Sequence, residues 1–142
     1  MKRVVIDTNI VISAYAFGGK PLQAIKEAFY STKIFVSKDI LDEYQTIAIR
    51  LLAKKKITES QARILLAAIA SLVANAKVVI PKKHFSLCRD PKDDHILACC
   101  IACQADFLIT GDCDLLVLDS QNNEVLSSHL RIVTATQFLT LI

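Results

Sequence analysis

Short aliphatic runs without polar alternation, such as Val4–Ile6, alternate along the chain with longer segments in which apolar residues recur every three or four positions. The short runs are typical of strands buried on both faces, and the longer segments are typical of amphipathic helices. Strands are predicted at Val4–Ile6, Lys33–Val36, Val78–Ile80, Phe107–Thr110 and Arg131–Val133. Helices are predicted at Ile10–Ala16, Pro21–Tyr30, Lys38–Lys54 and Thr58–Asn75, from Pro91 through the apolar run Ile96–Ala102, and at Thr134–Leu141.

Strands that alternate with helices predict a central parallel sheet covered on both faces. The expected class is therefore α/β, with a three-layer α/β/α, Rossmann-like architecture. No linker, internal repeat or low-complexity segment interrupts the 142 residues, and this length suits one core. A single domain over residues 1–142 is expected.

Acidic residues directly follow two of the predicted strands. Asp7 ends the run Val4–Ile6, and Asp112 follows Phe107–Thr110 in a turn rich in Gly and Asp. Because ligands bind in the crevice at the carboxyl ends of parallel strands, both carboxylates are predicted to meet at one edge of the sheet. The alternatives are that Asp7 only caps the following helix and that the second turn is an ordinary one.

Two predicted helices bring further acids to this edge. On the helix Lys38–Lys54, a count of 100° per residue places Glu43 at the edge of the apolar stripe and Asp42 almost opposite it. Asp94 lies in the first turn of the helix that begins at Pro91, and that end of the helix is predicted to lie at the same edge. The alternatives are a solvated boundary glutamate and first-turn acids that only complement the helix dipole.

Converging carboxylates need a compensating charge, because at about 4 Å and an effective dielectric of about 20 each pair costs on the order of 4 kcal/mol. All-oxygen ligands select hard divalent cations such as Mg²⁺ or Mn²⁺. Such an ion activates water and neutralises charge on phosphoryl oxygens. The acids therefore predict phosphodiester hydrolysis.

Composition adds two weaker indications. A hydrophobic content of 53% is high for a monomer of this size and indicates a buried subunit contact. The net charge of +3, from 17 basic and 14 acidic residues, is also that of an ordinary mixed surface. For the lysines at positions 54 to 56, a solvated helix end is the favoured explanation. Candidate phosphate-binding residues are the basic groups in two loops: Lys54, Lys55, Lys56, Lys82, Lys83 and Arg89.

The five cysteines do not form a disulfide pattern. Three of them, Cys99, Cys100 and Cys103, lie in one apolar run and are expected to be small buried hydrophobes, as in a protein of the reducing cytoplasm. Neither a signal peptide nor a membrane-spanning helix is predicted, since Ser71 and Asn75 break the longest apolar stretch.

Four segments, VVIDTN, SKDILDEY, CRDPKDDHILA and ITGDCDLL, together resemble the PIN domain family, and within it the VapC-like toxin ribonucleases. The resemblance covers nearly the whole chain. It implies a PIN-like fold, Mg²⁺- or Mn²⁺-dependent cleavage of single-stranded RNA, a homodimer and, often, a toxin with an antitoxin partner. By similarity the catalytic and metal-binding acids are Asp7, Glu43, Asp94 and Asp112, with Asp114 as an additional metal-binding acid and Thr8, Asn9 and Thr110 in support. The resemblance and the helix face favour Asp94 over Asp93.

Two other functions stay open. A module of the same fold could bind RNA or a protein without cleavage, through the basic loops. A phosphotransfer enzyme would use Asp7 as a nucleophile. However, VVIDTN lacks the second aspartate two residues later that haloacid-dehalogenase-like phosphatases carry, so the nuclease is favoured.

Overall fold

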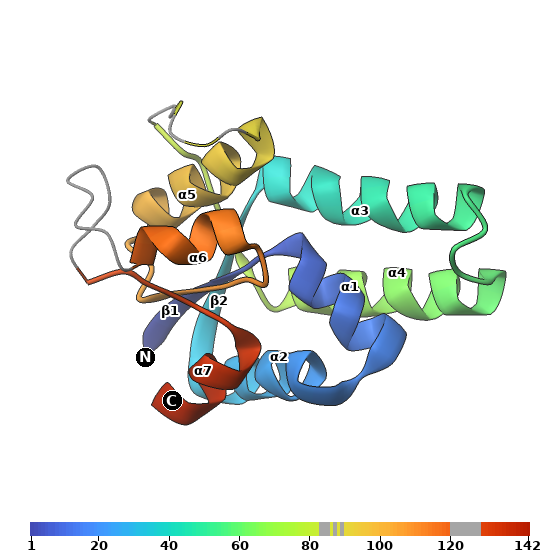
Figure 1. The fold of residues 1–142 in the computed structure, drawn as a ribbon, viewed down its shortest axis with the longest axis horizontal. Coiled ribbons are helices and arrows are strands. Elements are labelled where there is room, and N and C mark those ends of the chain that lie inside the picture. The colour runs from blue at the N-terminus through green and yellow to red at the C-terminus, as the bar shows by residue number, and fades with distance from the viewer. Residues whose placement is uncertain (83–85, 87, 89, 120–128) are drawn as a thin grey trace.

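The molecule is a five-stranded parallel sheet with helices packed on both faces (Figure 1). The computed structural model describes residues 1–82, 86, 88, 90–119 and 129–142. The strands in these residues are β1 (Lys2–Ile6), β2 (Thr32–Ser37), β3 (Lys77–Val79), β4 (Phe107–Ile109) and β5 (Arg131–Val133). The helices are α1 (Thr8–Phe17), α2 (Gly19–Ser31), α3 (Lys38–Ala53), α4 (Glu59–Ala74), α5 (Pro91–Cys103), α6 (Cys113–Asp119) and α7 (Ala135–Leu141).

The strand order β3-β2-β1-β4-β5 places β1 at the centre of the sheet. The chain moves outward from β1 to β3, crosses back through α5 to β4, and then continues to β5. Because such crossovers are right-handed, α1 to α4 cover one face and α5 and α6 cover the other, while α7 joins α2 on the first face. The order of strands reverses beside β1, which is the point at which open α/β sheets bind ligands. The predicted three-layer fold is confirmed.

The core is centred on β1 and α5, as the unalternating apolar runs predicted. Val4, Val5 and Ile6 have no exposed surface, and every residue of α5 from Ile96 to Cys100 is buried as well. The cysteines of the described residues are all free, and Cys99, Cys100 and Cys103 are buried among the apolar side chains. Their predicted role as small hydrophobes is confirmed.

Local sequence explains where the helices begin and end. Gly18 and Gly19 separate α1 from α2 with φ values of 70° and 68°, which glycine adopts without strain. Ser37 caps α3 by accepting from the amide of Ile40, and Thr58 and Gln61 form a capping box at α4. These termini agree with the predicted segments to within one or two residues.

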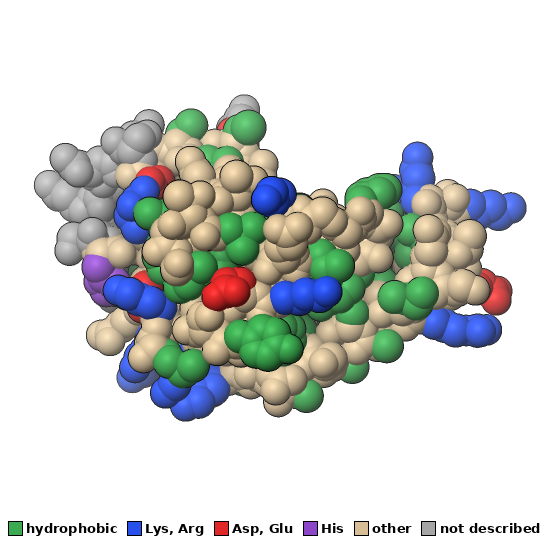
Figure 2. All heavy atoms as spheres, turned by 90° about the horizontal axis from the view of Figure 1, so that it is seen from below, with side chains coloured by type: hydrophobic (Ala, Val, Ile, Leu, Met, Phe, Trp, Pro, Cys, Tyr) green, Lys and Arg blue, Asp and Glu red, His purple; other side chains and the backbone are tan. Residues whose placement is uncertain are grey.

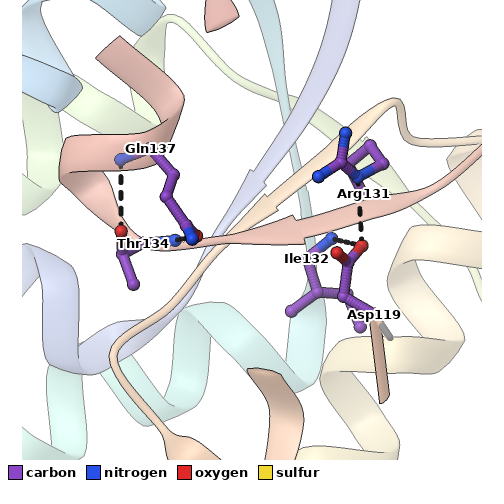
Figure 3. A network of polar contacts seen from close by, with 5 residues as sticks. All are labelled: Asp119, Arg131, Ile132, Thr134 and Gln137. Atoms are coloured by element: carbon purple, nitrogen blue, oxygen red, sulfur yellow. Dashed lines mark hydrogen bonds and ion pairs between the residues drawn. The ribbon is translucent and has the colours of Figure 1, made fainter. Parts of the chain in front are cut away.

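Two elements differ from the sequence-based prediction. β3 is shifted by one residue from the predicted Val78–Ile80, and it is an edge strand that pairs only with β2. The short helix α6 was missed because it follows the Asp-rich turn with only seven residues. Its last residue, Asp119, accepts from the amide of Ile132 at 2.8 Å and pairs with Arg131 at 3.3 Å, which ties α6 to β5 (Figure 3). The same view shows the capping box that starts α7, formed by Thr134 and Gln137.

The helices α3 and α4 form a hairpin that extends beyond the sheet, with their connecting turn at its far end (Figure 1). Figure 2 shows Lys and Arg side chains around this end and hydrophobic side chains exposed between it and the body. The exposed apolar residues of the hairpin include Ile49 and Ile64, of which about 60% is accessible (62% and 59%). No helix in the described ranges has both the length and the apolar character required to cross a bilayer.

Candidate active site

Asp7 and Thr110 lie side by side at the carboxyl ends of the two central strands. The register pairs Ile6 with Ile109, so Asp7 and Thr110, which directly follow these residues, lie side by side at the sheet edge. Both are buried, and Thr110 Oγ1 donates to Asp7 Oδ2 at 2.6 Å. Asp7 precedes α1, but its side chain makes no capping hydrogen bond to that helix. The Thr110 hydroxyl is therefore a stronger partner of this carboxylate than the first amides of α1.

The turn after β4 places Asp112 beside Asp7. The Thr110 hydroxyl that donates to Asp7 also accepts from the Asp112 amide at 3.0 Å, so one side chain joins the two acidic turns. Asp112 Oδ1 in turn accepts from the backbone amide of Asp114 at 2.9 Å. Asp114 itself is exposed, in the first turn of α6. Asn9 of α1 also contacts this turn, because its Oδ1 accepts a hydrogen bond from the Gly111 amide at 3.5 Å.

Glu43 is held near Asp7 by the neighbouring tyrosine of α3. Tyr44 is fully buried and its hydroxyl donates to the carbonyl oxygen of Ile6 at 2.5 Å, which fixes α3 against the end of β1. Glu43 is half-buried at the boundary of the helix, whereas Asp42 is exposed. Both placements agree with the predicted helical face. The role of Tyr44 was missed, because a tyrosine in an apolar stripe carries no signal of where its hydroxyl binds.

The acids at the start of α5 separate into two roles. Asp93 and Asp94 are equally buried, each with 7% of its surface exposed, but Asp93 lines the cleft with Asp7 and Asp112. Asp94 does not line it, and its Oδ1 accepts from the amide of Cys88 at 2.9 Å. The helical face could not separate the two acids, because α5 is buried nearly all round and both residues have apolar neighbours three and four positions later.

These side chains surround an open cleft of about 360 Å³. One end is acidic and the other is apolar, where Ile12 of α1 meets Ile47 and Leu51 of α3. The acidic end contains five carboxylates and one lysine of the described residues: Asp7, Glu43, Asp90, Asp93, Asp112 and Lys92. Sequence reasoning had not placed Asp90 or Lys92 in the site, and it had favoured Asp94 over Asp93.

Burial and mutual repulsion raise the pKa of three of these acids. For Asp7, burial raises the pKa and the charge of Asp112 adds to it, although the Thr110 hydroxyl opposes both. For Glu43, burial and then the charge of Asp7 raise the pKa, and Lys92 lowers it. Burial, the charge of Asp112 and a hydrogen bond to that carboxylate raise the pKa of Asp93 to about 7. Without a cation, Asp93 is therefore still partly protonated near pH 7.

The donor set suits a hard divalent cation. Within the described residues, no three acidic, histidine or cysteine side chains form a ready-made metal site. The available ligands are nevertheless all oxygens, and Mg²⁺ commonly binds through one or two carboxylates while keeping several waters. Thr8 Oγ1 is a buried oxygen at the cleft with no hydrogen bond of normal geometry, although it lies near enough to Glu43 to lower its pKa. A bound cation with its waters would partner this oxygen and replace the proton that Asp93 holds.

Among the basic residues proposed from sequence, those that the structure describes do not line the cleft. Lys54 and Lys55 follow the end of α3, roughly 16 Å along the helix from Glu43 at 1.5 Å per residue. Lys82 is exposed after β3. Lys83 and Arg89 lie outside the described residues.

Comparison with known proteins gives one family and several related folds. Residues 3–114 match the model of the PIN domain. The solved structures that are similar include VapBC2 from Rickettsia felis bound to a DNA fragment from their promoter, with 12% identity, a TM-score of 0.61, and 93% of this chain and 98% of that chain covered. They also include VapBC-1 from nontypeable Haemophilus influenzae, with 18% identity, a TM-score of 0.58, and coverages of 94% and 98%. No curated protein matches the sequence.

Proposed function

Because the chain belongs to the PIN domain family, as its sequence resemblance predicted, we propose that it is a divalent-metal-dependent endoribonuclease that hydrolyses single-stranded RNA. The observation that carries the proposal is the convergence of Asp7, Glu43, Asp93 and Asp112 in one cleft at the point where the strand order reverses. Four carboxylates in one cleft, three of them with a raised pKa, have no structural benefit there, and a hydrolase that binds Mg²⁺ or Mn²⁺ gives them a use.

In this proposal the metal-binding acids are Asp7, Glu43, Asp93 and Asp112. The sequence favoured Asp94 as the helix acid, but the cleft lining favours Asp93, since the Asp94 carboxylate already accepts from Cys88. Asp114 has a supporting position, because its amide orients Asp112. Thr8 and Thr110 complete the polar wall, the first with its unpartnered hydroxyl and the second with its bond to Asp7.

Held by these acids, Mg²⁺ or Mn²⁺ would supply an activated water and would neutralise charge on the phosphodiester. The side chains of the chain orient the site around it. Thr110 holds one oxygen of Asp7 and the backbone of Asp112 in a fixed relation, and Tyr44 fixes the helix that carries Glu43. The apolar end of the cleft, formed in part by Ile47 and Leu51, offers a surface to an unstacked base.

We further propose that the protein is the toxin of a type II toxin–antitoxin system and forms a homodimer. Two observations support this. The similar solved structures are titled VapBC, and apolar side chains such as Ile49, Ile64 and Phe17 are exposed on the helices of this chain. A second copy and an antitoxin segment would bury these surfaces. The cytoplasm, where RNA is accessible and cysteines stay reduced, is the expected compartment.

The proposal is tested by digestion of a mixed single-stranded RNA pool with and without Mn²⁺. Cleavage is expected only with the metal, and Asp7→Asn is expected to reduce its rate by roughly 100-fold or more. Glu43→Gln should act similarly, whereas Asp42→Asn, one residue away on the exposed face of α3, should cleave normally. Cleavage that persists in EDTA, or that Asp7→Asn leaves intact, would exclude this mechanism.

Partner binding is tested separately by light scattering at micromolar concentrations and by co-purification with the product of a neighbouring gene. A strictly monomeric protein would contradict the dimer. The alternative function, a PIN module that binds RNA or protein without cleavage, predicts RNA binding that withstands Asp7→Asn and no cleavage under any metal condition. The acid cluster favours the nuclease.

A further inference from the structure

Lys92 is the only basic side chain that lines the cleft among the described residues. It stands at the second position of α5, after the N-cap Asp90 and Pro91. The positive end of the helix dipole disfavours a cation in this turn. The next two residues, Asp93 and Asp94, carry the negative charge that the dipole favours. Helix stability therefore does not account for a lysine at this position.

The backbone of Lys92 is fixed, although its side chain is exposed. Its amide donates to Asp90 Oδ1 at 3.0 Å, and the preceding proline restricts the turn. The side chain thus begins from a defined point on the rim of the acidic end. Within the part of the chain that the structure describes, no ion pair engages its ammonium group.

The charge of Lys92 nevertheless acts on the site, because it opposes the effects of burial and of Asp7 on the pKa of Glu43. The ammonium group is therefore close enough to the Glu43 carboxylate to act on its charge, and the side chain lines the same cleft. A polyanionic substrate that approaches the acids meets five carboxylates, and one cation at the rim offsets part of that repulsion. Lysine binds phosphate as a point charge with three donors.

We propose that Lys92 binds a non-bridging oxygen of the RNA phosphodiester that enters the acidic end of the cleft. This inference rests on the proposed function and adds a substrate-binding residue to it. The lysines suggested by sequence, Lys54 and Lys55, lie far along α3 and would contact only distant phosphates of a longer RNA. Lys92 contacts the reacting region itself.

The experiment compares Lys92→Gln and Lys92→Arg with Lys38→Gln as the matched control. Lys38 is also an exposed lysine in the first turn of a helix, but it does not line the cleft. With a short labelled single-stranded RNA and Mn²⁺, Lys92→Gln is expected to lower kcat/KM roughly tenfold or more. The dependence of log kcat/KM on log salt should become shallower by about 0.7, the value for one lost phosphate contact on a single strand. Lys92→Arg should keep most of the rate, and Lys38→Gln all of it.

Melting curves in a Mn²⁺ titration distinguish phosphate binding by Lys92 from a purely structural or metal-related role. Because Lys92→Gln removes a positive charge beside Glu43, its Mn²⁺ midpoint should stay the same or fall, even though RNA cleavage weakens. A raised midpoint that accounts for the whole loss of rate would overturn the proposal. So would a kcat/KM and a salt slope equal to those of Lys38→Gln.

Failure of the proposed function gives a different result. If the original protein cleaves no RNA, binding of the same oligonucleotide is measured by fluorescence anisotropy in Mn²⁺. Weaker binding by Lys92→Gln than by Lys38→Gln then supports the phosphate contact in a non-cleaving module. Equal binding by the two variants, or no binding by the original protein, refutes it.

Discussion

Replacement of Asp93 by asparagine should stabilise the metal-free protein at alkaline pH. Asp93 is buried against Asp112, Asp90 and Asp7, and these surroundings raise its pKa to about 7 from an ordinary 3.8. Asparagine carries no charge, and its amide can donate to Asp112 as the protonated carboxyl does. The substitution therefore removes the repulsion and keeps the hydrogen bond.

The magnitude follows from the shift in pKa. A difference of roughly 3 pKa units corresponds to about 4 kcal/mol at most. Because Asp93 faces an open cleft in which solvent and ions screen its charge, we expect about 1 to 2 kcal/mol. The folded pKa lies above the unfolded one, so this stability is fully present below pH 3.8 and is lost as the pH rises through about 7. The Tm of Asp93→Asn relative to that of the original protein should thus rise by roughly 3 to 6 °C between pH 5 and pH 8.

The assay is a set of melting curves in EDTA at pH 5, 6, 7 and 8, repeated with Mn²⁺ at pH 8. Mn²⁺ should reverse the order, since a ligand at 100 times its Kd stabilises the folded state by about 2.7 kcal/mol and the variant lacks one ligand. Asp94→Asn is the neighbouring control, because its oxygen can still accept from Cys88, and it should keep most of the metal response. A difference in Tm between Asp93→Asn and the original protein that does not grow with pH would refute the reasoning.

Three further predictions concern side chains that support the cluster. Thr110→Val removes the donor that lowers the pKa of Asp7, so the acid limb of the pH–rate profile should move to higher pH, and urea unfolding should show a loss of about 1 to 3 kcal/mol. Tyr44→Phe removes the hydroxyl that donates to the Ile6 carbonyl, so the free energy of unfolding should fall by about 1 to 3 kcal/mol. The kcat should also fall, because Glu43 loses its fixed position. Unchanged stability and rate would contradict this role. Asp119→Ala frees the Ile132 amide and should lower the Tm by a few degrees without a change in cleavage, because this contact lies at the end of α6 away from the cleft; the same two assays check it.

The fold was predictable from the sequence because its signals are local and agree with one another. The unbroken run Val4–Ile6, the Ser37 cap and the pair Asp90–Pro91 each define one element boundary, and alternation of the elements defines a parallel sheet. The short helix α6 was missed, since seven residues after a turn show no periodicity.

The site was predictable only in part. Asp7 and Asp112 follow from strand ends, and Glu43 follows from its place on a helical face, because in these cases position along an element determines direction in space. The choice between Asp93 and Asp94 does not follow in this way, since it depends on a contact of Asp94 with the Cys88 amide just before α5, which helical periodicity does not describe. Lys92 was not found either, because the sequence does not show that the first turn of α5 lines the same cleft as Glu43 of α3.

The pairing of β1 with β4 also determines when the site can exist during synthesis of the chain. Thr110 and Asp7 are separated by 103 positions in sequence, and Asp112 follows still later. While β4 is still inside the ribosome, Asp7 lies at the end of an incomplete sheet. It then lacks both the Thr110 hydroxyl that orients it and the Asp112 carboxylate beside it. The growing polypeptide therefore carries no assembled acid cluster until the strand Phe107–Ile109 and the turn after it have left the ribosome and closed against β1.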